Sequence, residues 1–162
     1  MATLQLIPLA AIRAARIRIA ETAITTPLLR LDVDDAPAEI YIKLENLQPA
    51  GSVKIRGAGN ALGVARPEQL ASGVWTASTG NMARGVAWAA RRRGVHCRAV
   101  IPDTAPRSQL AAVERLGAKV IQVPRDDWWR LIRGRAPDDL PPAARPRDVL
   151  AGRPGEAACW PR

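Results

Sequence analysis

The chain has 162 residues, 48% apolar and 24% charged, which is typical of a globular domain with a hydrophobic core and excludes disorder throughout. The net charge of +9 and the pI near 11.1 admit a nucleic-acid partner. However, the arginines are scattered and the few aromatic residues form no stacking stripe, so we expect no nucleic-acid binding and interpret the positive charge as attracting small anions.

The cysteines and the N-terminus indicate a cytoplasmic protein. Cys97 and Cys159 have no metal-ligand spacing and are too few for a disulfide framework. Arginines at positions 13, 16 and 18 interrupt the apolar N-terminal residues before an export signal can form. No apolar run approaches the roughly 18 residues of a membrane-spanning helix, so we expect no membrane partner.

The first third of the chain predicts one helix and two extended segments. Apolar residues recur at helical spacing over residues 8–21 and predict an amphipathic helix. Pro27 forces the preceding residue out of the helical region, so residues 28–31 should be extended. An acidic turn at 32–37 then leads to the alternating run 39–44, which predicts a strand.

Lys54 stands among small residues in the stretch 51–58, in a chain with only two other lysines, Lys43 and Lys119. An amine can lose its proton and form an imine, whereas a guanidinium cannot. The pattern from Lys54 onward predicts a helix that ends at Pro67, and the positive end of a helix dipole favours a neutral amine. We therefore interpret Lys54 as a Schiff-base lysine; the alternative is a solvated lysine that opens a helix.

The remaining pattern predicts a parallel sheet covered by helices. Strands are expected at 74–77, 95–101 and 119–123, and helices at 82–93, 107–116 and 126–133. The turn Ser78-Thr79-Gly80-Asn81 joins a strand to a helix N-terminus, where free N–H groups can bind an anion, although a simple helix cap explains these residues equally well. His96, the only histidine, lies on an expected strand and is assigned a structural role.

Four motifs follow one another along the chain: Thr26-Pro27-Leu28, the run 43–48 (KLENLQ), the run 51–58 (GSVKIRGA) and the run 78–87 (STGNMARGVA). In their order and spacing they resemble the serine/threonine dehydratase group of fold-type II pyridoxal phosphate enzymes. The resemblance covers about residues 8–133. It implies an α/β fold with a parallel sheet flanked by helices, an incomplete form of the tryptophan synthase beta-like pyridoxal phosphate fold.

The resemblance also implies a role for each site residue. Lys54 would hold the cofactor, pyridoxal 5′-phosphate, as a Schiff base and then transfer the proton at the substrate α-carbon. Asn81 would bond to the cofactor 3′-oxygen, and Ser78, Thr79 and Gly80 would bind the carboxylate of a small amino-acid substrate. No metal is implied. The reaction would be β-elimination, dehydration and deamination of threonine or serine to a 2-oxo acid and ammonia.

Length and three substitutions set the chain apart from that group. Val53 replaces a usual phenylalanine, and Met82 and Arg84 replace a His and a Gln. Family members are roughly twice as long and have a later glycine-rich phosphate loop; full-length relatives are expected to be homo-oligomers. We therefore expect an N-terminal fragment, weakly active or inactive. Residues 1–66 would open the larger domain, and 67–133 would form the small α/β domain.

The segment 134–162 is expected to be an irregular tail. It is rich in Arg, Pro, Ala and Gly and has no apolar periodicity. A frameshift in GC-rich coding sequence produces such a composition, which is our hypothesis for its origin. The alternatives to a dehydratase are another fold-type II enzyme (threonine synthase, hydroxyaspartate dehydratase or racemase) and a non-catalytic basic fragment.

Overall fold

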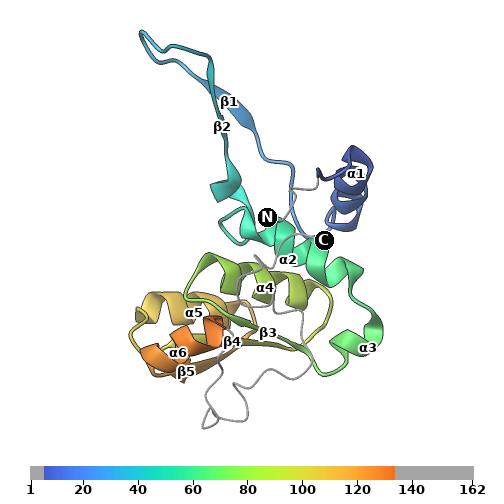
Figure 1. The fold of residues 1–162 in the computed structure, drawn as a ribbon, viewed down its shortest axis with the longest axis vertical. Helices are drawn as coiled ribbons and strands as arrows, with labels where there is room; N and C mark the ends of the chain where they lie inside the picture. Colours follow the sequence, from blue (N-terminus) through green and yellow to red (C-terminus); the bar gives the residue numbers. More distant parts are fainter. Residues whose placement is uncertain (1–5, 134–162) are drawn as a thin grey trace.

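A three-stranded parallel sheet and a separate two-stranded hairpin organise the protein, whose computed structural model describes residues 6–133. Figure 1 shows the parallel sheet among helices and the hairpin extending away from them. The elements in chain order are α1 (Leu9–Arg18), β1 (Leu28–Leu31), β2 (Ile40–Lys43), the 3-10 helix η1 (Glu45–Leu47), α2 (Lys54–Val64), α3 (Pro67–Leu70), β3 (Val74–Ala77), α4 (Asn81–Arg92), β4 (Cys97–Pro102), α5 (Arg107–Arg115), β5 (Lys119–Val123) and α6 (Arg125–Ile132).

The parallel sheet has the order β3-β4-β5, with Val74 opposite Cys97 and Arg98 opposite Lys119. Helices α4 and α5 connect successive strands, as parallel pairing requires. The expected parallel sheet flanked by helices is thus confirmed. No helix among residues 6–133 is long and apolar enough to cross a membrane.

Side chains alternate between the two faces of this sheet. One face packs against α4 and α5 through residues such as Val74, Ala99 and Val113. The other packs against α6 through Trp75, Val100 and residues that include Val123, Leu131 and Trp128. Trp128 also donates its Nε1–H to the Val100 carbonyl at 3.1 Å. Both faces are therefore covered over β3 and β4, whose residues are mostly buried, whereas the edge strand β5 buries only Val123.

The N-terminal elements are covered far less. Every residue of β1 and β2 is exposed, and the hairpin pairs only within itself, with Leu28 opposite Lys43. Helix α1 buries none of its residues, although Ile19 just after it is buried. The amphipathic pattern correctly predicted this helix but not the exposure of its apolar face, since α2 is its main neighbour among the described elements.

Most expected boundaries lie within two residues of the observed ones, and β3 and β5 match the expected residues. The short helix α3 was missed. Pro67 was expected only to end the preceding helix, but it opens α3, where the N–H that proline lacks needs no partner. The division into 1–66 and 67–133 remains a prediction, and the tail 134–162 lies outside the described residues.

We predict that Ile101→Ala lowers the free energy of unfolding by about 2–5 kcal/mol, because Ile101 is fully buried on the α4 and α5 face of the sheet. Denaturant titration checks this. Ile42→Ala on the exposed strand β2 is the matched control and should cost much less. Equal losses in the two variants would contradict the burial argument.

Candidate functional site

Lys54 is the first residue of α2, as the sequence predicts, and its side chain is exposed. Its backbone is held by α4. A Cβ placed on Gly85 would lie 3.1 Å from the Lys54 carbonyl carbon and 3.1 Å from the Ile55 nitrogen. A side chain at position 85 would therefore push the two helices apart by a few tenths of an ångström. Because Gly85 follows Asn81 by one helical turn, the Lys54 backbone lies against the start of α4.

The turn from Ser78 to Asn81 leads from β3 into α4. Ser78 N–H donates to the Val100 carbonyl at 3.2 Å, which fixes the turn to the neighbouring strand. Gly80 N–H donates to Ser78 Oγ at 3.3 Å, and no side chain caps the first turn of α4. The first N–H groups of this helix are therefore available to an anion. A Cβ at Gly80 would meet no atom within 4 Å, so the space beside this turn is open.

The structure therefore brings the backbone of the predicted lysine against the helix that follows the predicted anion turn, through the packing of α2 on α4 (Figure 1). Asn81 is exposed as the first residue of α4, and Thr79 and Gly80 are partly exposed. Among the described residues, no hydrogen bond or ion pair engages the Lys54 amine.

Glu45 forms a network that the sequence did not indicate. Its carboxylate accepts hydrogen bonds from Arg56 Nε at 2.8 Å and Arg56 Nη2 at 2.7 Å, and from Thr26 Oγ1 at 2.7 Å. Gln48 adds a bond at 3.2 Å. The fork of Arg56 lowers the pKa of Glu45 to about 2, with smaller contributions from Thr26 and Gln48 and an opposing one from burial.

This network fixes the first turn of the lysine helix. Arg56 follows Lys54 by two residues and also donates to the Ile24 carbonyl at 3.1 Å. Gln48 exchanges two hydrogen bonds with the Ile24 backbone, at 3.0 and 2.8 Å. Glu45, Gln48 and Arg56 all stand in motifs that carry the family resemblance, but their pairing spans a loop, and no local pattern shows it.

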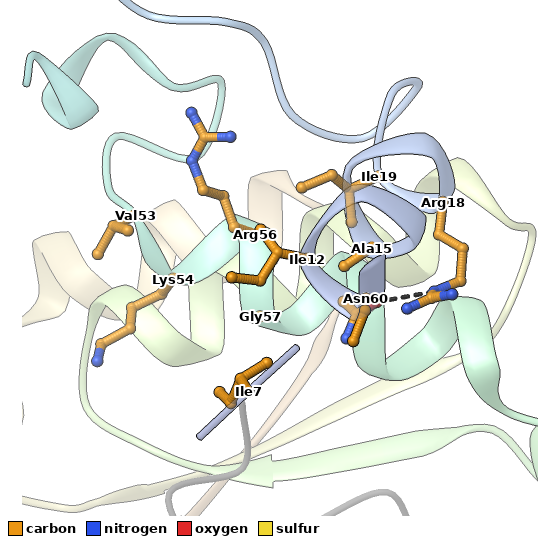
Figure 2. A pocket seen from close by; sticks show the side chains of 11 residues that line it. Ile7, Ile12, Ala15, Arg18, Ile19, Val53, Lys54, Arg56, Gly57 and Asn60 are labelled. Atoms are coloured by element: carbon orange, nitrogen blue, oxygen red, sulfur yellow. Dashed lines mark hydrogen bonds between the residues drawn. The ribbon is translucent and has the colours of Figure 1, made fainter. Parts of the chain in front are cut away.

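A groove of about 280 Å³ lies between α1 and α2. Figure 2 shows Ile12 and Ala15 of α1 facing α2, and the hydrogen bond of 2.9 Å from Arg18 Nε to Asn60 Oδ1 near one end. Val53 and Lys54 lie at the other end. No residue of the turn 78–81 lines the groove, so it is distinct from the anion turn.

In the part of the chain that the structure describes, the remaining reactive side-chain types, cysteine and histidine, contribute nothing to the candidate site. Cys97 is buried in the sheet, and burial raises the pKa of its thiol to about 12, which makes it a poor nucleophile. His96 is exposed and precedes β4 instead of lying on it. Residues 6–133 contain no cluster of three His, Cys, Asp or Glu side chains that could hold a metal ion.

Comparison with known proteins identifies the family. A family model described as "Pyridoxal-phosphate dependent enzyme" matches residues 19–140, three quarters of the chain. The chain belongs to this enzyme family. A catabolic L-threonine dehydratase, TdcB, of Staphylococcus aureus strain N315 is 38% identical over 122 residues, which cover 74% of this chain and 35% of that enzyme. The chain therefore spans about a third of the curated relatives it matches.

Comparison with solved structures supports the same family assignment. Maize serine racemase superposes with a TM-score of 0.67 at 38% identity, covering 72% of this chain and 36% of that one. The processed form of threonine deaminase isoform 2 from Solanum lycopersicum superposes with a TM-score of 0.62 at 33% identity, covering 72% and 36%. The fold-type II assignment from the four motifs is confirmed, and the relatives include both dehydratases and racemases.

We predict that Gly85→Ala destabilises the protein by about 1–3 kcal/mol, because the new methyl group would press on the backbone of Lys54 and Ile55. Gly63→Ala, in the last turn of α2, is the control. Its methyl group would meet only the side chains of Arg93 and Arg18, at 3.3 Å or more, so it should be neutral or stabilising. Thermal unfolding of both variants checks this, and similar melting temperatures would contradict it.

We predict that Glu45 makes stability depend on pH below its ordinary pKa. The folded-state pKa of about 2 lies below the ordinary value of 4.5, so the contribution of Glu45 is complete above about pH 4.5 and is lost as the pH falls toward 2. Glu45→Gln should flatten this part of the profile in denaturant titrations. Glu39→Gln, which breaks an exposed pair with Arg30, is the control and should retain the steep profile.

Proposed function

We propose that the chain carries the lysine and the substrate-carboxylate turn of a cytoplasmic pyridoxal phosphate-dependent ammonia-lyase that dehydrates and deaminates a hydroxy amino acid such as threonine or serine. The observation that supports this best is the packing of Gly85 on the Lys54 backbone, one helical turn after the start of α4. The 38% identity to a threonine dehydratase favours this reaction within the family.

The residues present fit the cofactor. Lys54 offers an exposed amine with no partner among the described residues, which suits a covalent bond to an aldehyde carbon. The exposed Asn81 amide, one helical turn before Gly85, suits a hydrogen bond to the ring oxygen. When bound, pyridoxal phosphate supplies an electron sink for the pair of electrons left at the substrate α-carbon.

The remaining steps fall to side chains and backbone of this chain. The uncapped first turn of α4, with Ser78, Thr79 and Gly80, would bind the substrate carboxylate through N–H groups and hydroxyls. This contact would orient the α-carbon. The Lys54 amine, once released, would take the α-proton, and loss of the β-hydroxyl followed by hydrolysis gives the 2-oxo acid and ammonia.

A racemase is the second candidate, because maize serine racemase is as similar to this chain as the dehydratase is, at 38% identity. Both reactions begin with removal of the α-proton. They differ in product, since a racemase returns the amino acid with inverted configuration. Chiral chromatography of the amino acid alongside a 2-oxo acid assay separates the two.

We predict that pyridoxal phosphate, trapped by borohydride reduction, modifies Lys54 in preference to Lys43 and Lys119. The Lys43 amine donates a hydrogen bond to the Thr26 carbonyl. Lys119 is the first residue of β5, away from the turn 78–81. Peptide mass spectrometry measures the distribution. Asn81→Ala should lower the share on Lys54 about threefold to tenfold, the loss of one hydrogen bond.

Lys54→Ala controls for non-specific modification and should leave only the low background on Lys43 and Lys119. We expect at most weak 2-oxo acid production from threonine or serine, and none in Lys54→Ala. If all three lysines of the unaltered protein are modified to the same extent, the assignment of Lys54 as the cofactor lysine is wrong.

A further inference from the structure

The Arg84 side chain contacts Gly51, three residues before Lys54. Arg84 lies on the first turn of α4, where its N–H donates to the Gly80 carbonyl at 3.1 Å. Its guanidinium group lies against Gly51: a Cβ built on Gly51 would be 2.9 Å from Arg84 Nη2. Gly51 has φ +73°, a conformation that favours glycine. The backbone conformation restricts position 51 to glycine, and the guanidinium occupies the space beside it.

Arg84 and Gly85 together contact both ends of the segment that carries the lysine. Arg84 packs on Gly51, and the adjacent Gly85 packs on the backbone of Lys54 and Ile55. One turn further along α4, Trp88 donates its Nε1–H to the Thr22 carbonyl at 2.9 Å. This face of α4 therefore contacts the N-terminal elements at successive points, and Arg84 is the point nearest the turn before Lys54.

Two buried polar atoms in the segments that form this contact have no hydrogen-bond partner. Among the described residues, Arg84 Nε and Ser52 Oγ are both buried and have no hydrogen-bond partner. Ser52 is 8% exposed and follows Gly51 directly. Unpaired buried donors and acceptors destabilise a fold. Hydrogen bonding of Arg84 Nε therefore does not account for the position of this side chain, which leaves the contact of its guanidinium with Gly51.

We propose that Arg84 is a positioning residue for Lys54: its guanidinium group packs against Gly51, holds the Gly51–Ser52 turn in place and so fixes where α2 begins. The relevance to catalysis rests on the function proposed above, but the positioning itself does not. Arg84 acts through the turn and needs no contact with substrate or cofactor. This explains a residue that the sequence marked only as a departure from the family pattern.

Hydrogen exchange of the unliganded protein tests the positioning directly. Gly51 N–H donates to the Gln48 carbonyl at 2.6 Å and Arg56 N–H to the Val53 carbonyl at 3.0 Å, so both amides report on the turn. In Arg84→Met we expect exchange of the 51–56 peptide to rise about tenfold. The peptide of α5 should be unchanged and the melting temperature equal or higher, because the buried unpaired Nε–H is gone.

Arg92→Met is the matched control, since Arg92 is exposed on the last turn of the same helix. It should change neither peptide. If Arg84→Met does not fold, Arg84→Lys, which keeps the charge but not the planar fork, is measured the same way. Unchanged exchange at 51–56, or a rise of the same size in α5, would overturn the proposal.

A double-mutant cycle tests whether Arg84 acts through Gly51. Gly51→Ala adds a methyl group that collides with the guanidinium, so its effect on exchange should be smaller when Arg84 is already methionine. Additive effects would contradict the proposal. Reductive trapping on Lys54 should also fall about tenfold in Arg84→Met. If the unaltered protein shows no trapping on Lys54 but Arg84→Met still raises exchange at 51–56, the proposed function is wrong and the positioning role of Arg84 stands.

Discussion

The close packing of α2 on α4 is the constraint on which the candidate site depends. Lys54 and the turn at Ser78–Asn81 lie on different elements, and no hydrogen bond or ion pair within the described residues joins them. Gly85 lets the backbone of Lys54 approach α4 to contact distance. A side chain at this position would press on the Lys54 backbone and shift it by a few tenths of an ångström, so the candidate site depends first on backbone contact.

The loop before α2 needs its own restraints, because the 3-10 helix and hairpin that precede it are largely exposed. The Glu45–Arg56 pair supplies one of them. Its two short bonds of 2.8 and 2.7 Å are bidentate, a geometry that restricts orientation as well as distance. Thr26 and Gln48 share the same carboxylate. The start of α2 is therefore held from the loop side by this network and from the α4 side by Gly85.

The sequence predicted the regular elements well where local chemistry determines them. The strands β3 and β5 are apolar, β-rich runs bounded by glycine or proline, and both were placed correctly. Lys54 was correctly placed at a helix start because small residues and an apolar period adjoin it. Helix α3 was missed because four residues give no detectable period. The Glu45–Arg56 pair and the contact of Arg84 with Gly51 join segments distant in sequence, and a single sequence carries no signal for such contacts.

The exposure of Lys54 limits which steps of the proposed reaction the described residues could support. Val53, just before it, is 49% exposed, and the groove between α1 and α2 opens beside it. In the proposed reaction, binding, orientation and proton transfer would depend on position, to which Gly85 and the uncapped turn of α4 contribute. Exclusion of water depends on burial, and the described residues do not bury this amine. An imine open to water is readily hydrolysed, so the described residues would leave an imine at Lys54 unprotected. A covalent trap therefore reports on Lys54 more directly than an equilibrium absorbance band, because reduction captures the bond before water can reverse it.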